Sequence, residues 1–68
     1  MDATIAIIKQ TINAAAGPVS WGALVDAVGP ANRRYILAAM TAIEQEGFAA
    51  RRTRYDPVAG GVFEVVKL

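Results

Sequence analysis

The sequence predicts one small α+β domain in which three helices come first and a β-hairpin follows. Three observations carry this prediction. Apolar residues recur at helical spacing as far as Glu46, and glycines, two of them followed by proline, divide this region into segments. Beyond Gly47 the chain is rich in β-branched and aromatic residues around a turn-forming stretch. Because 68 residues can bury only one small core, we expect residues 1–68 to form a single domain.

The first helix is expected from Asp2 to Ala16, with Asp2 as its N-terminal cap and Gly17-Pro18 as its end. Ile7 lies nearly opposite the core-facing stripe of this helix, which makes it a candidate for an exposed interface. The alternative is that Ile7 is tucked under a terminus. The stripe itself comprises Ile5, Ile8, Ile12 and Ala16.

A second helix is expected from Trp21 to Val28. Ser20 is well suited to cap its start, Gly29-Pro30 should end it, and a short strand at Val19 should precede it. Trp21 is interpreted as a packing residue at the helix start rather than as a platform for a ligand.

The third helix is expected to begin after Asn32, a good capping residue, and to reach Glu46. Gly47 can then take the left-handed conformation that stops a helix. Only residues 29–31 separate the second and third helices, and so short a connection forces a sharp angle between them, as in a helix-turn-helix. The core-facing stripe of the third helix comprises Ile36, Ala39, Met40 and Ile43.

The last third of the chain predicts a β-hairpin. Its strands are expected at Phe48 to Tyr55 and at Val62 to Leu68, joined by turn formers from Asp56 to Gly61.

Composition excludes several classes of site. The chain has no cysteine and no histidine, and Ser20 is its only serine, so the usual zinc ligands and an activated nucleophile are missing. No spacing suggests paired carboxylates or a phosphate-binding loop. We therefore expect no enzyme activity, no metal and no cofactor. The chain also lacks a signal peptide and a membrane span, which predicts a cytoplasmic protein, of a prokaryotic or phage-infected cell by its size and style.

The order of these elements resembles the winged helix-turn-helix superfamily. The segment Gly17-Pro18-Val19-Ser20 leading into Ala23-Leu24-Val25 looks like the family's entry to its second helix. The residues that look like its third helix running into the wing are Ile36, Met40, Ile43, Glu44, Gly47 and Phe48. The resemblance covers almost the whole chain, and its motifs identify a way of folding rather than an activity.

The resemblance implies contact with double-stranded DNA through the third helix and the hairpin. Arg33 and Arg34 suit phosphate or guanine contacts, although they could also be ordinary surface residues. The middle of the helix offers methyl groups and one hydroxyl, where base readers usually carry longer polar side chains. The candidate DNA-binding residues of this helix are Asn32, Arg33, Arg34, Tyr35, Leu37, Ala38 and Thr41, with Ala42 also facing outward.

The basic strand of the hairpin is the second candidate contact. Strand alternation should place Arg52 and Arg54 on one face and Arg51 on the other, together with Thr53. The hairpin tip carries no positive charge, so we expect the strand arginines, rather than the tip, to meet phosphates. The alternative is that these charges protect an edge strand from unwanted pairing.

Two functional hypotheses follow. The first is a small DNA-binding protein that regulates transcription or assists replication or recombination. The alternative is a protein-interaction or dimerisation module with little or no DNA binding, because 54% of the residues are hydrophobic and a domain this small cannot bury them all. Its candidate interface residues are Ile7, Leu37 and Ala42. The two can coexist, since dimerisation would double the few base contacts of one domain.

Overall fold

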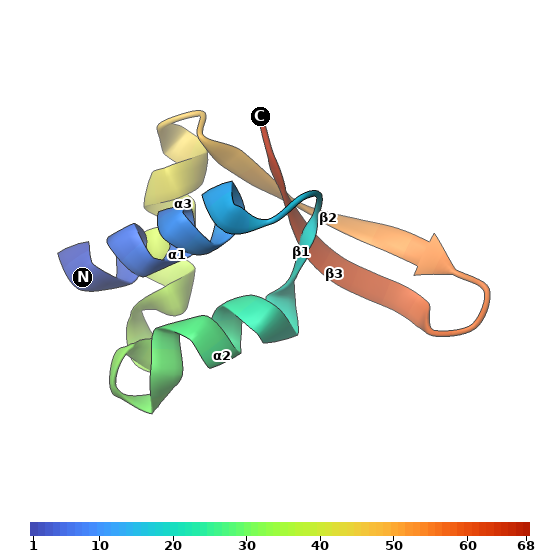
Figure 1. Ribbon diagram of the computed structural model, residues 1–68, viewed down its shortest axis with the longest axis horizontal. Coiled ribbons are helices and arrows are strands. Elements are labelled where there is room, and N and C mark those ends of the chain that lie inside the picture. The colour runs from blue at the N-terminus through green and yellow to red at the C-terminus, as the bar shows by residue number, and fades with distance from the viewer.

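The protein is an α+β domain with a three-stranded antiparallel sheet, seen in a computed structural model that describes all residues 1–68. The helices gather at one end and the hairpin projects away from them, within extents of 36 × 25 × 20 Å (Figure 1). The elements in order are α1 (Asp2–Ala14), β1 (Val19–Ser20), α2 (Trp21–Asn32), the 3-10 helix η1 (Arg33–Tyr35), α3 (Ile36–Gln45), β2 (Ala49–Asp56) and β3 (Gly60–Lys67).

The first helix differs from its prediction at both ends. Its cap position is Met1, which makes no side-chain capping bond, and Asp2 lies inside the first turn. The helix ends at Ala14, so Ala16 is exposed and contributes nothing to the core. Ile7, the candidate for an exposed interface on this helix, is not fully exposed. Ile7 is partly buried and packs against the core, because the core extends beyond the narrow stripe read from the sequence.

The second helix begins as predicted, and its regular helical conformation ends at Gly29, as predicted, although a further helical turn follows directly. Ser20 caps its start, with its Oγ accepting a hydrogen bond of 3.1 Å from the backbone N–H of Ala23. Gly29 breaks the helical conformation with φ 74° and ψ 170°, but Pro30 resumes it at once. The resumption has a simple cause, since proline is favoured in the first helical turn. The expected loop over residues 29–31 is therefore a single-residue kink.

The third helical segment is divided where one helix was expected. Asn32 makes no side-chain capping bond, because the chain arrives at it already helical, and the 3-10 turn η1 follows before α3 begins at Ile36. The helical region thus departs from the three separate helices predicted. The end of α3 agrees with expectation: Gly47 has φ 79°, its N–H donates to the Glu44 carbonyl at 3.0 Å, and the Phe48 N–H donates to the Ile43 carbonyl at 3.2 Å.

The hairpin forms the sheet with the short strand β1 in the order β1-β3-β2. Val19 pairs with Val65, and Arg52 pairs with Glu64. Asp56 shapes the turn, since its Oδ1 accepts from the backbone N–H groups of Val58 at 2.8 Å and Ala59 at 3.0 Å. The predicted β-hairpin is confirmed.

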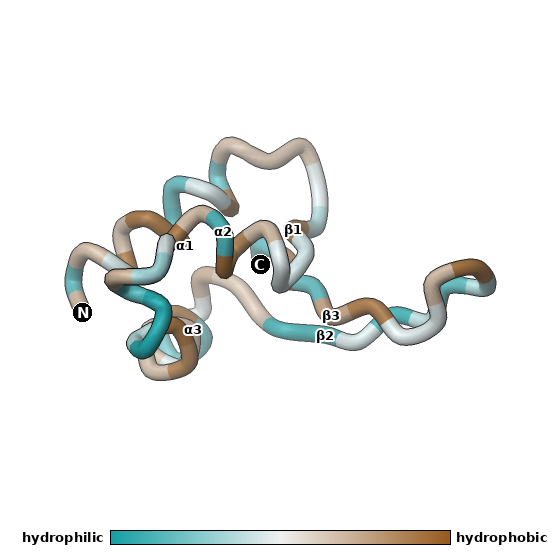
Figure 2. Tube along the Cα trace, turned by 90° about the horizontal axis from the view of Figure 1, so that it is seen from below, coloured by the Kyte–Doolittle hydropathy of each residue, from teal (hydrophilic) through white to brown (hydrophobic).

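The core lies between the helices and the base of the hairpin. Val19, Ala49 and Val65 form the part of the sheet that the helices cover. The hairpin continues outward past the helical body, as the tube in Figure 2 shows. No helix is both long and apolar enough to cross a bilayer. The buried core comprises Ile8, Ile12, Val19, Leu24, Val28, Ile36, Ala39, Met40, Ile43, Ala49 and Val65.

Gly29 is the position where a side chain is expected to be most costly. Its φ and ψ fall in a region that essentially only glycine occupies, so Gly29→Ala should lower the free energy of unfolding by about 1–3 kcal/mol. Gly17→Ala is the control, because a Cβ there also meets no atom within 4 Å and the backbone has no positive φ. Urea unfolding followed by circular dichroism measures both. Equal stability of the two variants would contradict the assigned kink.

Candidate functional site

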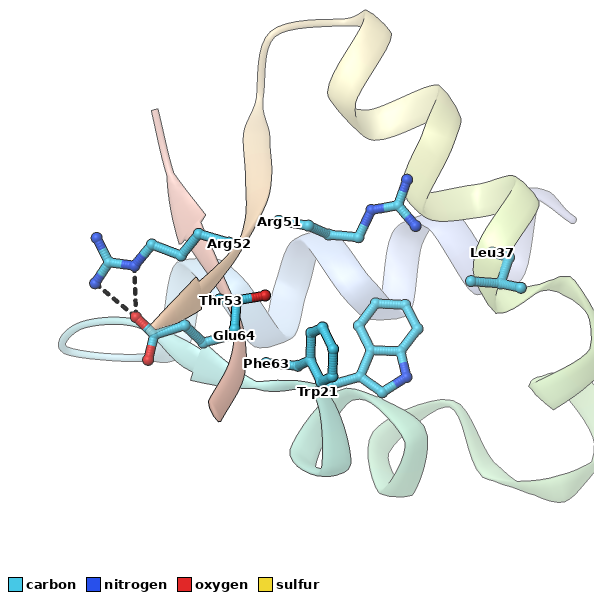
Figure 3. Close-up of a pocket in the computed structure, with 7 residues that line it drawn as sticks. All are labelled: Trp21, Leu37, Arg51, Arg52, Thr53, Phe63 and Glu64. Carbon is cyan, nitrogen blue, oxygen red and sulfur yellow. Dashed lines mark hydrogen bonds and ion pairs between the residues drawn. The ribbon is translucent and has the colours of Figure 1, made fainter. Parts of the chain in front are cut away.

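A groove of about 580 Å³ lies between α3 and the projecting hairpin, with the start of α2 beside it (Figure 3). It exists because the helix-facing side of the hairpin runs on beyond the helices that cover its base. The outward face of α3 and the uncovered face of the hairpin therefore meet at an angle, and no other element fills the space between them. The groove is lined by Trp21, Leu37, Arg51, Arg52, Thr53, Phe63 and Glu64, of which Arg52 and Glu64 direct their side chains away from it (Figure 3).

Apolar side chains make the walls of this groove. Leu37 is 61% exposed and Phe63 is 68% exposed, and both border the same groove. Trp21 packs partly on the core, as predicted, and its indole also borders the groove beside the Phe63 ring. Phe63 was missed as a site residue. The signal that could have found it is alternation, because Phe63 lies two residues from the buried Val65 and so shares its face.

Arg51 is the one hairpin arginine directed toward α3 (Figure 3). Its Nη2 lies 2.6 Å from Glu44 Oε1, and its side chain is still 41% exposed. One ion pair occupies part of a guanidinium that carries five N–H donors, so further donors remain for a ligand.

Arg52 and Arg54 lie on the opposite face of the hairpin, as alternation predicted. Both hold the carboxylate of Glu64, which is only 4% exposed: Arg52 Nε donates to Oε2 at 2.6 Å and Arg54 Nε donates to Oε1 at 2.9 Å. Arg54 Nη1 also lies 3.6 Å from Asp56 Oδ2. The hydrogen bond from Arg54 is the main reason that the pKa of Glu64 falls below its ordinary value. This carboxylate, which sequence reasoning missed, offsets the positive charge of the two arginines together with Asp56.

Three basic side chains form no ion pair: Arg33 and Arg34, which are neighbours at the start of the third helical segment, and Lys67, which lies at the end of β3. Arg33 and Arg34 are exposed and form no ion pair. Arg34 Nη2 donates a 2.6 Å hydrogen bond to the Tyr35 hydroxyl, and its guanidinium lies 4.7 Å from the centre of that ring. Asn32 and Tyr35 are themselves half-buried. These two arginines are therefore the cations best able to meet an external anion.

The outward face of α3 is uncharged, as the sequence indicated. Leu37, Ala38 and Thr41 are exposed, whereas Ala42 is half-buried. The Thr41 hydroxyl donates to the Leu37 carbonyl at 3.0 Å, so its proton is already used. The predicted site residues thus separate into three places: the start of α3 with its outward face, Arg51 across the groove, and the two arginines held by Glu64 behind the hairpin.

Glu64 should make the stability of the fold sensitive to acid. Since its pKa is lower in the folded state than in the unfolded chain, its stabilising effect is present at neutral pH and is lost as the pH falls through the folded-state pKa. We expect Glu64→Gln to lower the melting temperature at neutral pH and to reduce the further loss between about pH 5 and pH 3. Asp56, whose pKa is lowered mainly by the Ala59 N–H, leaves some acid sensitivity in the variant.

Melting curves over this pH range test the expectation. Glu46→Gln is the matched control, because it removes a carboxylate whose ion pair with Lys9 is largely solvent-exposed and so contributes little. If the melting temperature falls with pH in the same way for Glu64→Gln and for the unaltered protein, the Glu64 carboxylate is not a source of the acid sensitivity.

Comparison with known proteins gives no relative on which to build. No protein-family model, no curated protein and no solved structure matches this chain.

Proposed function

We propose that the protein is a winged-helix DNA-binding domain that contacts double-stranded DNA through the start of the third helical segment and the outward face of α3. The observation that carries the proposal is the placement of Arg33 and Arg34, two exposed arginines without ion pairs, immediately before this uncharged face. The order of the helices, the short strand and the projecting hairpin supports the winged-helix part of the proposal.

The contacts follow from the side chains. Arg33 and Arg34 each offer a planar fork to phosphate oxygens or to a guanine edge, while Ala38 can meet a thymine methyl group. Arg51 adds a phosphate contact from the hairpin. Arg52 and Arg54 do not belong to the proposed surface, because they lie on the other face and carboxylates offset their charge. Affinity would come mostly from phosphates, with limited reading of sequence.

The salt dependence of binding tests this proposal. For labelled duplex DNA, the plot of log affinity against log salt should have a slope that becomes shallower by about 1.8 in the double variant Arg33→Gln with Arg34→Gln, because each lost phosphate contact removes about 0.9. Fluorescence anisotropy at several salt concentrations measures the slope.

Lys9→Gln serves as the control in the same titration. It removes a positive charge near Glu46, at the other end of α3 from the two arginines, and should leave the slope unchanged. Absence of duplex binding at tens of micromolar protein in low salt would end the proposal.

A protein-interaction role is the second candidate, and the apolar groove favours it. Leu37 and Phe63 are largely exposed on facing walls, and interface cores are depleted in charge in the same way. Ile7 does not contribute to this candidate, since it packs against the core.

Leu37→Arg separates the two candidates because they predict opposite effects. A positive charge beside Arg33 and Arg34 should strengthen duplex binding by adding a phosphate contact. Burying the same unpaired charge in a protein interface should weaken self-association by roughly tenfold or more. Sedimentation at several protein concentrations, together with the anisotropy assay, measures both effects. If self-association is unchanged in this variant, the face of α3 that lines the groove is not part of a dimer interface.

A further inference from the structure

We propose that the groove between α3 and the hairpin binds unpaired nucleobases, so that the protein holds single-stranded nucleic acid more tightly than a fully paired duplex. This inference rests on the proposed function, because it names the form of nucleic acid that the surface prefers. It concerns residues that duplex reading does not use: Trp21, Phe63 and Tyr55.

Two aromatic rings at the groove favour an unpaired base over a duplex. Trp21 and Phe63 border the same groove, and the Phe63 ring is largely open to solvent (Figure 3). In a duplex the faces of the bases are stacked on one another, and a protein meets only base edges and phosphates. An unpaired base exposes its face and can stack on an aromatic side chain, whatever its sequence. The rings therefore match a single strand better than a duplex.

The aromatic surface continues outward along the hairpin. Tyr55 is 77% exposed and, by strand alternation, lies on the same face as Thr53, which pairs with Phe63. Successive bases of one strand could thus meet Trp21, Phe63 and then Tyr55. A path of this kind, with rings spaced along one face, is what a sequence-tolerant single-strand site requires.

Arginine N–H donors lie beside the groove and can meet the phosphates of a strand. Arg51 points across the groove with donors to spare beyond its pair with Glu44. Arg33 is not part of the groove lining, but it precedes Leu37 by only four residues in the chain and has no carboxylate partner. The acidic groups nearby are already engaged, Glu44 by Arg51 and Glu64 by Arg52 and Arg54. Phosphates flanking a stacked base would find a cation beside the groove.

Self-association is less well matched to this surface. The free edge of β2 carries three arginines, and pairing two such edges would bring like charges together at a cost. A second copy seated in the groove is the competing occupant, and the experiment below separates it from a nucleic-acid strand.

The test uses two readouts on the full chain. Trp21 is the only tryptophan, so stacking of a base on it should quench the intrinsic fluorescence of the protein. Labelled oligothymidylate of about 12 nucleotides, within the range of single-strand site sizes, and a duplex of the same length are titrated at one salt concentration by anisotropy. We expect the single strand to bind more tightly and to quench Trp21 more strongly. Oligouridylate in a parallel titration shows whether the strand is recognised as DNA or as RNA.

Substitutions at Phe63 distinguish stacking from general apolar contact. Phe63→Tyr should retain single-strand affinity, whereas Phe63→Leu and Phe63→Ala should weaken it by about 5- to 150-fold, the usual effect of removing one stacking ring. Duplex affinity should change little in all three variants. Val58→Ala is the control, because Val58 is 97% exposed at the turn and lies outside the groove.

Three results would overturn the inference. Single strands that bind no more tightly than duplex and leave Trp21 unquenched would refute it, even if duplex binding still depends on Arg33 and Arg34 and the proposed function stands. Full affinity in Phe63→Leu would show an apolar contact without stacking. Concentration-dependent self-association that is lost in Phe63→Ala would identify a dimer surface. If neither nucleic acid binds, the proposed function fails as well.

Discussion

The register of β3 against its two neighbours is the constraint on which the rest of the structure depends. Val65 is fully buried against the helices, and the adjacent Glu64 is buried on the other face beneath two arginines. A shift of one residue would exchange these two side chains, placing a carboxylate in the core and a valine among guanidinium groups. Because the register is fixed at the base, alternation also fixes the outer part of the hairpin. Phe63 must then face the helical side, at a point where no helix covers it.

The same alternation decides what the positive charges can do. The three hairpin arginines are divided between two faces, and each has a carboxylate within ion-pair distance: Glu44 for Arg51, and Glu64 for Arg52 and Arg54. The hairpin therefore contributes little long-range attraction for an anion. Arg33 and Arg34 keep their charge available because both are exposed and neither forms an ion pair. The location of free charge, rather than the net charge of +1, thus points to the start of α3.

Local signals predicted the elements of the fold, whereas contacts between distant residues decided the details that the sequence left open. The Ser20 cap, the glycine stop at Gly47 and the hairpin turn depend on a few neighbouring residues, and all three formed as expected. The continuation of α2 through Pro30 was not anticipated, since both an ending and a restart are compatible with Gly-Pro. The Glu64 cluster joins side chains 10 and 12 residues apart, and strand pairing had to be known before it could be inferred. The groove was missed for the same reason.

The grouping of the exposed apolar residues is more informative than their number. Only 13 of 68 residues are buried, so a chain with 54% hydrophobic residues must leave many of them in contact with water. Met1, Val58 and Leu68 are exposed at the two chain ends and the turn, where isolated apolar groups are ordinary. Leu37 and Phe63 differ because they come from distant segments and converge with Trp21 on one concave surface. Neither Leu37 nor Phe63 belongs to the buried core, so their convergence is a property of the surface and does not serve to close the interior.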